Sequence, residues 1–405
     1  MLTYNTAIRV LLKNITPLTA VEVPLSEALG QVLSEPVYSR WDLPTADNSA
    51  MDGYAFTFGG QRAGDNLPVA GFIPAGRPFS GKLVEGQAIK IMTGGLMPPE
   101  CDTVVPIEAV VESGQSIYLT ESPTEGQHVR RRGEEISKGE KLLSPGTAIH
   151  AGEMGLLAAA GAERVWVHPR LCVALLSTGD ELVELGTVPG PGQIINSNFH
   201  MLSARLREEG CTVIPLGIAQ DNKALTSERI REGLKADMLI TTGGVSVGDR
   251  DYVQDALRVH GFELGFWRVA IKPGKPVLFG TAQGTPVLGL PGNPAASAAT
   301  FELFVRPALR RLAGHPDTLP PRMRVTLTAT VTGDSKRQSF LWGALREEAG
   351  AYLFTPSRWQ GSGQTRSIQA STALLPVPPA IEGFPAGSNV EVLLLRLPPG
   401  ISNPV

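Results

Sequence analysis

Three loops rich in glycine, proline and charge carry the residues best suited to chemistry. They read TTGGVSVGDRDY (241–252), AIKPGKP (270–276) and GLPGNP (289–294). Glycine lets backbone N–H groups turn toward a bound anion, because no Cβ blocks the approach. Lys272 and Lys275 flank a stiff Pro-Gly turn, which presents two ammonium groups together. These loops predict a binding site for a phosphate-bearing ligand.

The third loop also opens a predicted helix. Asn293 is expected to cap an apolar helix over residues 295–312, with Pro294 at its first helical position. Unpaired N–H groups at a helix start attract anions, so this helix would strengthen the phosphate site.

Acidic residues near these loops indicate a cation beside the phosphate. Glu181, Asp221 and Asp251 each follow a predicted strand, and Ser246 and Asp249 lie in the glycine loop itself. Carboxylates alone would repel a phosphate, whereas Mg²⁺ binds hard oxygen ligands from both groups. The same acids could instead hold a water molecule for attack on phosphorus, or cap the helices that follow them.

The elements that must position these loops alternate along the chain. Strands are expected at 171–176, 212–218, 238–241 and 286–290, and helices at 198–209, 223–234, 252–260 and 295–312. Such alternation is typical of a doubly wound parallel sheet. Ligands bind such sheets at the carboxyl ends of the strands. The residues that follow those ends are Ser177, Thr178, Gly179, Asp180, Glu181, 220–222, Gly243, Gly244 and 291–293.

β-rich segments are expected on both sides of this region. Residues 41–139 contain short Val and Ile runs divided by Gly and Pro, and a second such segment follows His315-Pro316. Residues 1–39 are expected to be helical, including 25–33, and helix returns at 152–160.

Three further motifs have local interpretations. The segments 47–56 (DNSAMDGYAF) and 91–98 (IMTGGLMP) read as tight turns that use Asp and Gly. The run 130–135 (RRRGEE) reads as a solvated, self-neutralising group of charges.

The composition is that of a globular protein with several domains. The chain has 405 residues, of which 42% are hydrophobic, and a formal net charge of -3 that gives no reason to expect nucleic-acid binding. Cys101, Cys172 and Cys211 are far apart and match neither a disulfide framework nor a zinc site. No apolar run approaches the roughly 20 residues that span a bilayer, and no signal peptide is evident, so we expect a cytoplasmic protein.

Together the motifs resemble the molybdopterin molybdenumtransferases, the family of bacterial MoeA and the gephyrin E domain. In the family's order they are DNSAMDGYAF (47–56), IMTGGLMP (91–98), RRRGEE (130–135), STGDEL (177–182), GGVSVGDRDYV (243–253), AIKPGKP (270–276), GLPGNP (289–294) and QGS (360–362). The resemblance covers nearly the whole chain. It implies insertion of molybdate into adenylylated molybdopterin, with release of AMP, in a Mg²⁺-dependent step of molybdenum cofactor biosynthesis.

The resemblance also implies a fold and an assembly. Residues 1–39 and 140–168 would form a split linking domain, 40–139 a β-rich domain, 169–315 the α/β molybdopterin-binding domain and 316–405 a C-terminal β barrel. Family members are homodimers in which the β-rich domain of one subunit completes the crevice of the other. The protein partners so implied are a molybdopterin adenylyltransferase and apo-molybdoenzymes.

Residue roles follow from the matching motif positions. Residues needed for activity would be Asp52, Thr93, Glu181, Asp221, Asp251, Lys272, Pro291 and Pro294. Substrate-binding residues would be Ser177, Thr178, Gly179, Gly243, Gly244, Ser246, Gly248, Asp249, Lys272, Lys275, Asn293 and Ser362. Lys272, Lys275 and Ser362 would bind molybdate, and Glu181 and Asp251 would hold the metal.

One departure from the family pattern bears on function. Where the family usually has Arg in an F-x-R-G segment, this chain has Trp342, which cannot pair with an oxyanion as Arg does. Arg337, Arg346 and Arg358 are the candidates to replace it. The departure leaves open a gephyrin-like scaffold or cofactor-storage protein that performs no turnover. The related molybdopterin adenylyltransferase is a third alternative, but it would not account for the β-rich domains.

Overall fold

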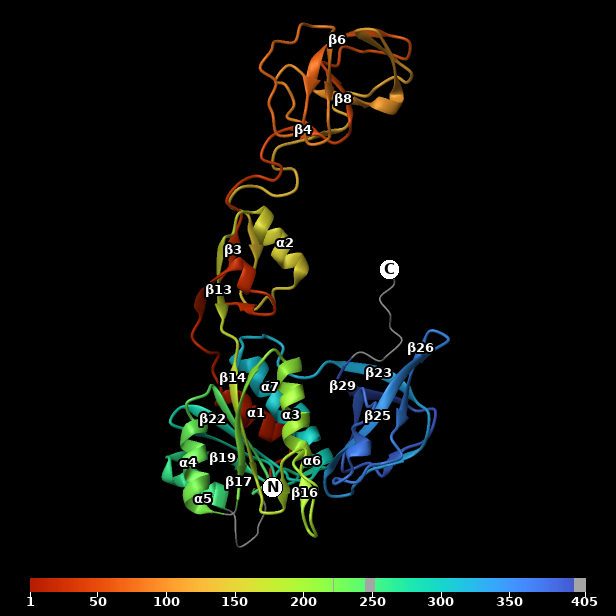
Figure 1. Ribbon diagram of the computed structural model, residues 1–405. Coiled ribbons are helices and arrows are strands. Elements are labelled where there is room, and N and C mark those ends of the chain that lie inside the picture. Colours follow the sequence, from red (N-terminus) through yellow and green to blue (C-terminus); the bar gives the residue numbers. More distant parts are fainter. Residues whose placement is uncertain (221, 245–251, 397–405) are drawn as a thin grey trace. The chain divides into compact units, whose positions relative to one another are not determined.

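The computed structural model describes residues 1–220, 222–244 and 252–396 (Figure 1). The chain divides into two compact units: unit 1 comprises Met1–Val21, Gly30–Val32 and His168–Val405, and unit 2 comprises Glu22–Leu29 and Leu33–Val167. The first 21 residues therefore group with the α/β region, although we expected residues 1–39 in a split linking domain. The reason is helix α1 (Tyr4–Lys13), whose Tyr4, Ala7, Ile8 and Leu11 are buried in the core of unit 1.

Unit 1 contains a six-stranded sheet in the order β17-β14-β18-β22-β21-β19. The first four are parallel, as expected: β17 (Thr212–Ala219), β14 (Cys172–Thr178), β18 (Met238–Thr242) and β22 (Thr285–Leu290). Two antiparallel strands, β21 (Leu278–Ala282) and β19 (Phe262–Trp267), complete one edge and were not predicted. Gln283 and Gly284, both at positive φ, connect β21 to β22, which is the two-residue turn of a hairpin.

Helices cover both faces of this sheet. They are α3 (Ser197–Glu208), α4 (Lys223–Gly233), α5 (Tyr252–Val259), α6 (Pro294–Thr300) and α7 (Arg306–Leu312). In β14, Val173 and Leu175 join the core that contains α1 and α3, whereas Ala174 and Leu176 join the core on the α4 side. Successive side chains of a strand point to opposite faces, so an uninterrupted apolar strand requires cover on both. The predicted doubly wound architecture is confirmed.

The predicted helices of this region are confirmed with one difference. The segment expected as a single helix over 295–312 is α6 and α7 joined by a π-helical turn, η3 (Phe301–Val305). A short parallel ribbon, β15 (Leu182–Val183) with β16 (Ile194–Ile195), lies between β14 and α3 in the sequence.

The C-terminal part of unit 1 is a closed five-stranded barrel, as predicted. Its strands are β23 (Arg322–Leu327), β25 (Gln338–Glu348), β26 (Ala351–Pro356), β27 (Ala373–Val377) and β29 (Asn389–Leu394), and β25 closes the ring by pairing with both β26 and β27. The short strand β20 (Ile271–Lys272) pairs with β25. A separate ladder joins β24 (Val331–Thr332) to β28 (Gly383–Phe384), and η4 (Thr365–Ser367) is a 3-10 turn. Phe340 and Trp342 share one core with Tyr4 and Phe304, so the barrel packs on the α/β domain.

Unit 2 is rich in β structure, as predicted for residues 41–139. One sheet has the order β8-β5-β7-β6-β10-β9, formed by β5 (Gly53–Phe56), β6 (Asn66–Ile73), β7 (Ala88–Ile91), β8 (Thr103–Pro106), β9 (Val110–Ser113) and β10 (Ser116–Leu119), with the turn η2 (Ile107–Ala109). Two short ladders pair β4 (Asn48–Ser49) with β11 (Val129–Arg130) and β3 (Val37–Tyr38) with β12 (Lys141–Leu143).

The remaining elements of unit 2 surround a small core. The sheet β1-β13-β2 contains β1 (Val21–Pro24), β13 (Arg164–His168) and β2 (Val32–Leu33), and helix α2 (Ala151–Ala159) confirms the helix expected at 152–160. The helix expected over 25–33 is wrong: the chain forms only a 3-10 turn, η1 (Leu25–Glu27), before β2. Gly30 at φ +79° interrupts any helix there. Within the described ranges, no helix is long and apolar enough to cross a membrane.

Candidate active site

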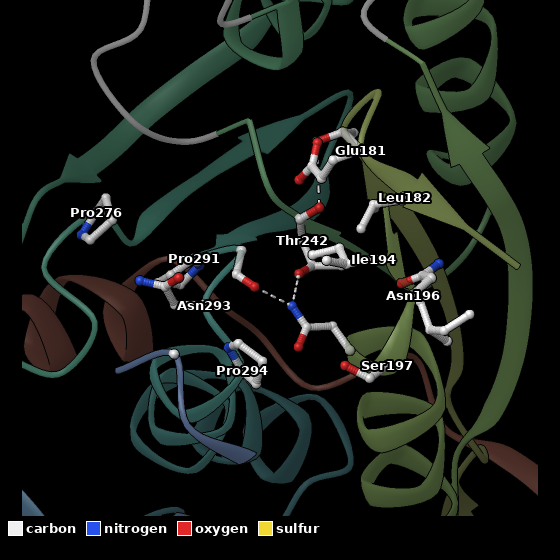
Figure 2. Close-up of a pocket in the computed structure, with 15 residues that line it drawn as sticks. Glu181, Leu182, Ile194, Asn196, Ser197, Thr242, Pro276, Pro291, Asn293 and Pro294 are labelled. Carbon is white, nitrogen blue, oxygen red and sulfur yellow. Dashed lines mark hydrogen bonds between the residues drawn. The ribbon is translucent and has the colours of Figure 1, made fainter. Parts of the chain in front are cut away.

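A pocket of about 450 Å³ lies at the carboxyl ends of the parallel strands of unit 1 (Figure 2). We call it the strand-end pocket. Its lining comprises Thr178, Glu181, Leu182, Ile194, Ile195, Asn196, Ser197, Asn198, Thr242, Pro276, Pro291, Gly292, Asn293, Pro294 and Gly363. The ends of β14, β18 and β22, the β15–β16 ribbon and the start of α3 therefore all contribute to one cavity. This is the edge at which the alternating sequence pattern predicted a ligand.

The glycines after β18 allow two strand ends to approach closely. Gly243 and Gly244 have φ of +88° and +60°, and a Cβ on Gly243 would lie 2.4 Å from the carbonyl oxygen of Thr178. A Cβ on Gly244 would lie 2.6 Å from Val253 Cγ2. Both the conformation and the space therefore require glycine. The expected partners Ser246, Gly248, Asp249 and Asp251 in the following loop, and Asp221, lie outside the described residues.

The segment after β14 divides its residues between the pocket and the core. Ser177 is fully buried and donates a hydrogen bond to Asn196 Oδ1 at 3.1 Å, and it is not part of the pocket lining. Thr178 lines the pocket and donates to the carbonyl oxygen of Thr242 at 3.4 Å. Gly179 has a φ of +142°, and a Cβ there would lie 2.4 Å from a carboxylate oxygen of Glu181. The glycine thus lets the exposed Glu181 carboxylate fold back beside the end of the strand.

The Pro291–Pro294 loop is held by Ser362. Asn293 occupies the predicted cap position of α6 with Pro294 after it, but its side chain accepts no capping hydrogen bond. Instead, Asn293 Nδ2 donates to Ser362 Oγ at 3.2 Å, and the Ser362 carbonyl accepts from Ala295 N at 3.0 Å and Ala296 N at 3.2 Å. These two amide groups are therefore already paired. The expected attraction of an anion to the start of this helix is weaker than the sequence suggested.

The lysine loop faces a second cavity. Lys272 lines a pocket of about 340 Å³ together with Pro273, Thr330, Val331, Thr332, Gly333, Ser339, Phe340, Leu341, Pro356, Ser357 and Gln360. We call it the lysine pocket. Two segments contribute to both pockets. The lysine loop places Lys272 on the lysine pocket and Pro276 on the strand-end pocket, and the segment 360–363 places Gln360 on the first and Gly363 on the second. The structure thus places Lys272 on a neighbouring pocket, although we expected it beside Glu181 in a single crevice.

An aspartate that the sequence analysis missed lies next to Lys272. Asp334 Oδ2 is 3.7 Å from Lys272 Nζ and 2.8 Å from Arg337 Nη2. The hydrogen bonds from the Arg337 side chain and from the backbone N–H of Lys336 lower the pKa of Asp334 to about 2. Its carboxylate therefore stays ionised as a counter-ion for both cations. The i, i+3 spacing of Asp334 and Arg337 could have predicted their ion pair, but nothing in the sequence connected that pair to Lys272.

Trp342 does not face either pocket. Its side chain is 1% exposed and belongs to the core shared by the barrel and α1. Of the three arginines considered as replacements, Arg337 is the one joined to Lys272 through a shared carboxylate. Arg346 pairs with Glu348, and Arg358 stacks on the Trp359 ring at 4.7 Å.

Two of the expected active-site residues meet in unit 2. Asp52 Oδ1 accepts hydrogen bonds from Thr93 N at 2.6 Å and Thr93 Oγ1 at 2.7 Å, and both residues are exposed. The backbone bond and then the hydroxyl bond lower the pKa of Asp52 below its ordinary value.

The run 130–135 was expected to neutralise itself, but two of its three arginines form ion pairs with residues outside the run. Arg131 binds Asp47 at 2.8 Å and Arg132 binds Asp42 at 2.6 Å. Asp47 belongs to the DNSAMDGYAF motif, so the Arg131–Asp47 ion pair connects two of the motifs that carry the family resemblance.

Two asparagines at the start of α3 complete the strand-end pocket and were not predicted. Asn196 Oδ1 accepts from Phe199 N at 3.3 Å and caps the helix, and Asn198 Nδ2 donates to Thr242 Oγ1 at 3.1 Å and to the Gly292 carbonyl at 2.6 Å. The sequence feature that could have predicted them is Asn-Ser-Asn directly after the apolar pair Ile194-Ile195. Among the described residues, no three His, Cys, Asp or Glu side chains form a cluster that could hold a metal, and Glu181 supplies the carboxylate of this pocket.

Comparisons with known proteins cover the whole fold. The MoeA N-terminal region (domain I and II) matches residues 2–161, a probable molybdopterin binding domain matches 174–311, and the MoeA C-terminal region (domain IV) matches 324–395. A molybdopterin molybdenumtransferase of Nostoc sp. is 38% identical over 386 residues, which is 93% of this chain and 88% of that protein. Molybdopterin molybdenumtransferase 2 of Mycobacterium tuberculosis is 37% identical over 92% of this chain and 94% of its own length. The crystal structure of a molybdopterin biosynthesis MoeA protein from Pyrococcus horikoshii has a TM-score of 0.83 at 30% identity, covering 98% of this chain and 99% of that one.

Proposed function

Since this chain belongs to the molybdopterin molybdenumtransferase family, we propose that it inserts molybdate into adenylylated molybdopterin and releases AMP in molybdenum cofactor biosynthesis. The observation that carries this proposal is the gathering of Thr178, Glu181 and the Pro291–Pro294 loop around one strand-end pocket. A cavity of about 450 Å³ at the carboxyl ends of parallel strands suits a small phosphorylated ligand.

In this proposal the phosphate groups bind over the glycine loop after β18. Thr178, Gly179, Gly243, Gly244 and Asn293 border the pocket or form the turns that shape it. Ser177 contributes indirectly, because it holds Asn196 at the pocket wall. The roles of Ser246, Gly248, Asp249, Asp221 and Asp251 remain predictions from the sequence.

Molybdate would bind at the lysine loop. Lys272 shares its pocket with the hydroxyl groups of Thr330, Thr332, Ser339 and Ser357, which are donors that suit a tetrahedral dianion. Lys275 is exposed in the same loop. Ser362 lies in the sequence between Gln360, which lines the lysine pocket, and Gly363, which lines the strand-end pocket. The two anionic substrates would therefore occupy neighbouring cavities.

Glu181 fits the magnesium ion that the family reaction implies. Mg²⁺ is commonly held by one or two carboxylates together with water and substrate phosphate oxygens, so a dedicated cluster of acids is not required. Glu181 would provide one such oxygen ligand at the pocket rim, and Asp251 would provide another. When bound, the ion would polarise the phosphoanhydride. The chain itself orients the phosphates and excludes water through the walls of the strand-end pocket.

We further propose a cytoplasmic homodimer in which unit 2 of one subunit completes the site on its partner. The support is chemical: Asp52 and Thr93 match family positions needed for activity, and their hydrogen-bonded pair lies in unit 2, whereas Glu181 and Lys272 lie in unit 1. A molybdopterin adenylyltransferase would supply the substrate, and apo-molybdoenzymes would receive the product.

The test is molybdate-dependent release of AMP. Purified protein is incubated with adenylylated molybdopterin, Mg²⁺ and molybdate, and AMP is quantified. We expect Lys272→Ala to weaken turnover at low molybdate about tenfold or more, since a charge-assisted hydrogen bond contributes roughly 1.5–3 kcal/mol. The control is Lys235→Ala, which removes an exposed lysine outside both pocket linings.

Three outcomes separate the alternatives. AMP release that requires molybdate supports the transferase. Retention of the pterin without any AMP release would identify a binding or storage protein instead. Unchanged turnover of Lys272→Ala at low molybdate would remove that lysine from the mechanism.

A further inference from the structure

We propose that Asn198 is a positioning residue that holds the root of the glycine loop after β18 against the Pro291–Pro294 loop. In this arrangement the strand-end pocket keeps the shape that a phosphate-bearing ligand requires. The inference deepens the proposed function and rests on it for the identity of the ligand. No chemical step is assigned to Asn198 itself.

The amide of Asn198 joins three walls of the strand-end pocket. From its place in α3, Nδ2 donates to Thr242 Oγ1 at the end of β18 (3.1 Å) and to the Gly292 carbonyl in the loop before α6 (2.6 Å). Figure 2 draws these hydrogen bonds as dashed lines, one of which ends at the labelled Thr242. Asn198 is 8% exposed, so water competes little for these bonds.

The neighbouring contacts make Thr242 a junction between strands. Its carbonyl oxygen accepts from Thr178 Oγ1 at 3.4 Å, and the next residue, Gly243, donates from its N–H to the Leu290 carbonyl at 3.1 Å. A shift at Thr242 would therefore move the start of the glycine loop and the end of β14 together. Asn198 restrains this junction from the helix side.

The acceptors around Asn198 determine which way its amide points. A carbonyl oxygen placed 2.6 Å from the Gly292 carbonyl would be repelled, so the NH₂ group must face that loop. The residue thus acts as a double donor. A carboxylate at the same position could not bond to the Gly292 carbonyl, and toward the Thr242 hydroxyl it could act only as an acceptor.

Asn196 provides a matched contrast two residues earlier. It lines the same pocket, but its Oδ1 acts as an acceptor, from Phe199 N at 3.3 Å and from Ser177 Oγ at 3.1 Å. An aspartate can perform both of these functions. The substitutions Asn196→Asp and Asn198→Asp therefore add the same charge to the same pocket, and the second also removes the donors.

The first experiment compares these two variants with AMP as the probe. Calorimetry measures the AMP dissociation constant, and thermal unfolding confirms that each variant is folded. We expect Asn198→Asp to bind AMP at least tenfold more weakly than Asn196→Asp, with a matching rise in KM for the adenylylated substrate. Equal affinities for the two variants would overturn the inference, because charge alone would then explain the effect.

The second experiment distinguishes hydrogen bonding from packing at the partner residue. Thr242 is 2% exposed, so Thr242→Val keeps the shape and removes the hydroxyl, whereas Thr242→Ser keeps the hydroxyl and leaves a small void. We expect AMP affinity to fall several-fold in Thr242→Val and to be retained in Thr242→Ser. The reverse order would show that packing, and not positioning by Asn198, is what matters.

The failure of this inference differs from failure of the proposed function. If wild-type protein binds AMP and the variants follow the expected order, Asn198 positions the pocket even if no AMP is released from adenylylated molybdopterin. If wild-type protein releases AMP but the AMP affinities of the variants do not follow the expected order, the proposed transferase function is retained and the positioning role of Asn198 is rejected. Wild-type protein that does not bind AMP would overturn the inference directly.

Discussion

Hydrogen bonds from backbone amides hold two aspartates in their ionised form: Asp52 in unit 2, and Asp334 beside Lys272 in unit 1. Asp52 accepts from the amide and hydroxyl of Thr93, and Asp334 accepts from the amides of Lys336 and Arg337 as well as from the Arg337 guanidinium. Donors that bind the charged form of a carboxyl group lower its pKa. Both aspartates are therefore available as acceptors and counter-ions at neutral pH.

At this scale we predict that Thr93→Val raises the pKa of Asp52 toward its ordinary value. The substitution removes the hydroxyl donor at 2.7 Å and leaves the backbone donor at 2.6 Å in place. A ¹³C NMR titration of the Asp52 carboxyl group measures the change. Thr93→Ser keeps the hydroxyl and should leave the pKa low. A pKa that stays unchanged in Thr93→Val would show that the hydroxyl bond does not form in solution.

Among the elements, the α6–η3–α7 segment contains a buried network of charge. Glu302 in the π-helical turn is 1% exposed and pairs with Arg205 of α3 and with Arg306 of α7, the latter at 2.7 Å. Arg306 also binds Glu209 at 2.7 Å. These pairs join the helix that carries Asn198 to the helix that follows the Pro291–Pro294 loop. The network therefore links two helical segments whose first residues, Ser197 and Pro294, line the strand-end pocket.

We predict that Glu302→Ala destabilises unit 1 by about 3–5 kcal/mol, because it leaves two guanidinium groups without their buried partner. Native-state hydrogen exchange of amides in α3 and α7 measures the loss. The control is Glu391→Ala, which breaks an exposed pair with Arg322 whose side chains are 45% and 52% accessible. We expect that change to cost less than about 1 kcal/mol. Similar losses for both variants would mean that burial of the network contributes little.

Across the whole molecule, the residues expected to act together belong to different compact units. Asp52 and Thr93 lie in unit 2, and Glu181 and Lys272 lie in unit 1. In the proposed homodimer each active site takes its unit 2 residues from the partner subunit. This arrangement predicts how much activity a dimer of two different inactive variants would have.

We predict that two inactive variants, Asp52→Ala and Glu181→Ala, complement each other when their subunits are mixed. If each site takes Asp52 from one subunit and Glu181 from the other, a mixed dimer contains one intact site and one doubly altered site. Random exchange gives mixed dimers for about half of the population, so activity should reach about a quarter of the wild-type value. AMP release after mixing and re-equilibration measures it. Mixtures that remain inactive would place both residues in one subunit's site, or exclude exchange, which mass spectrometry of the mixed dimers checks separately.

Local sequence patterns determined most of the elements and the edge of the sheet that carries the pocket. Helical spacing and apolar strands are local properties, so α3, α4, β14, β17 and β18 could be assigned within a few residues. Glycines at strand ends were correctly placed because their conformations are set by the adjacent backbone. The family motifs added the chemistry that periodicity could not supply.

Tertiary structure decided which of those residues meet. Asn198 bonds to Gly292, 94 residues later, and Ser362 meets Asn293 across 69 residues. Lys272, which lines a different pocket from Glu181, pairs with Asp334. None of these contacts follows from spacing: the first depends on how α3 packs at the sheet edge, and the other two depend on how the barrel region packs against the α/β domain. The antiparallel edge and the buried Trp342 have the same origin: apolar surface is covered by whichever segment folds onto it, and that choice is made by the complete chain.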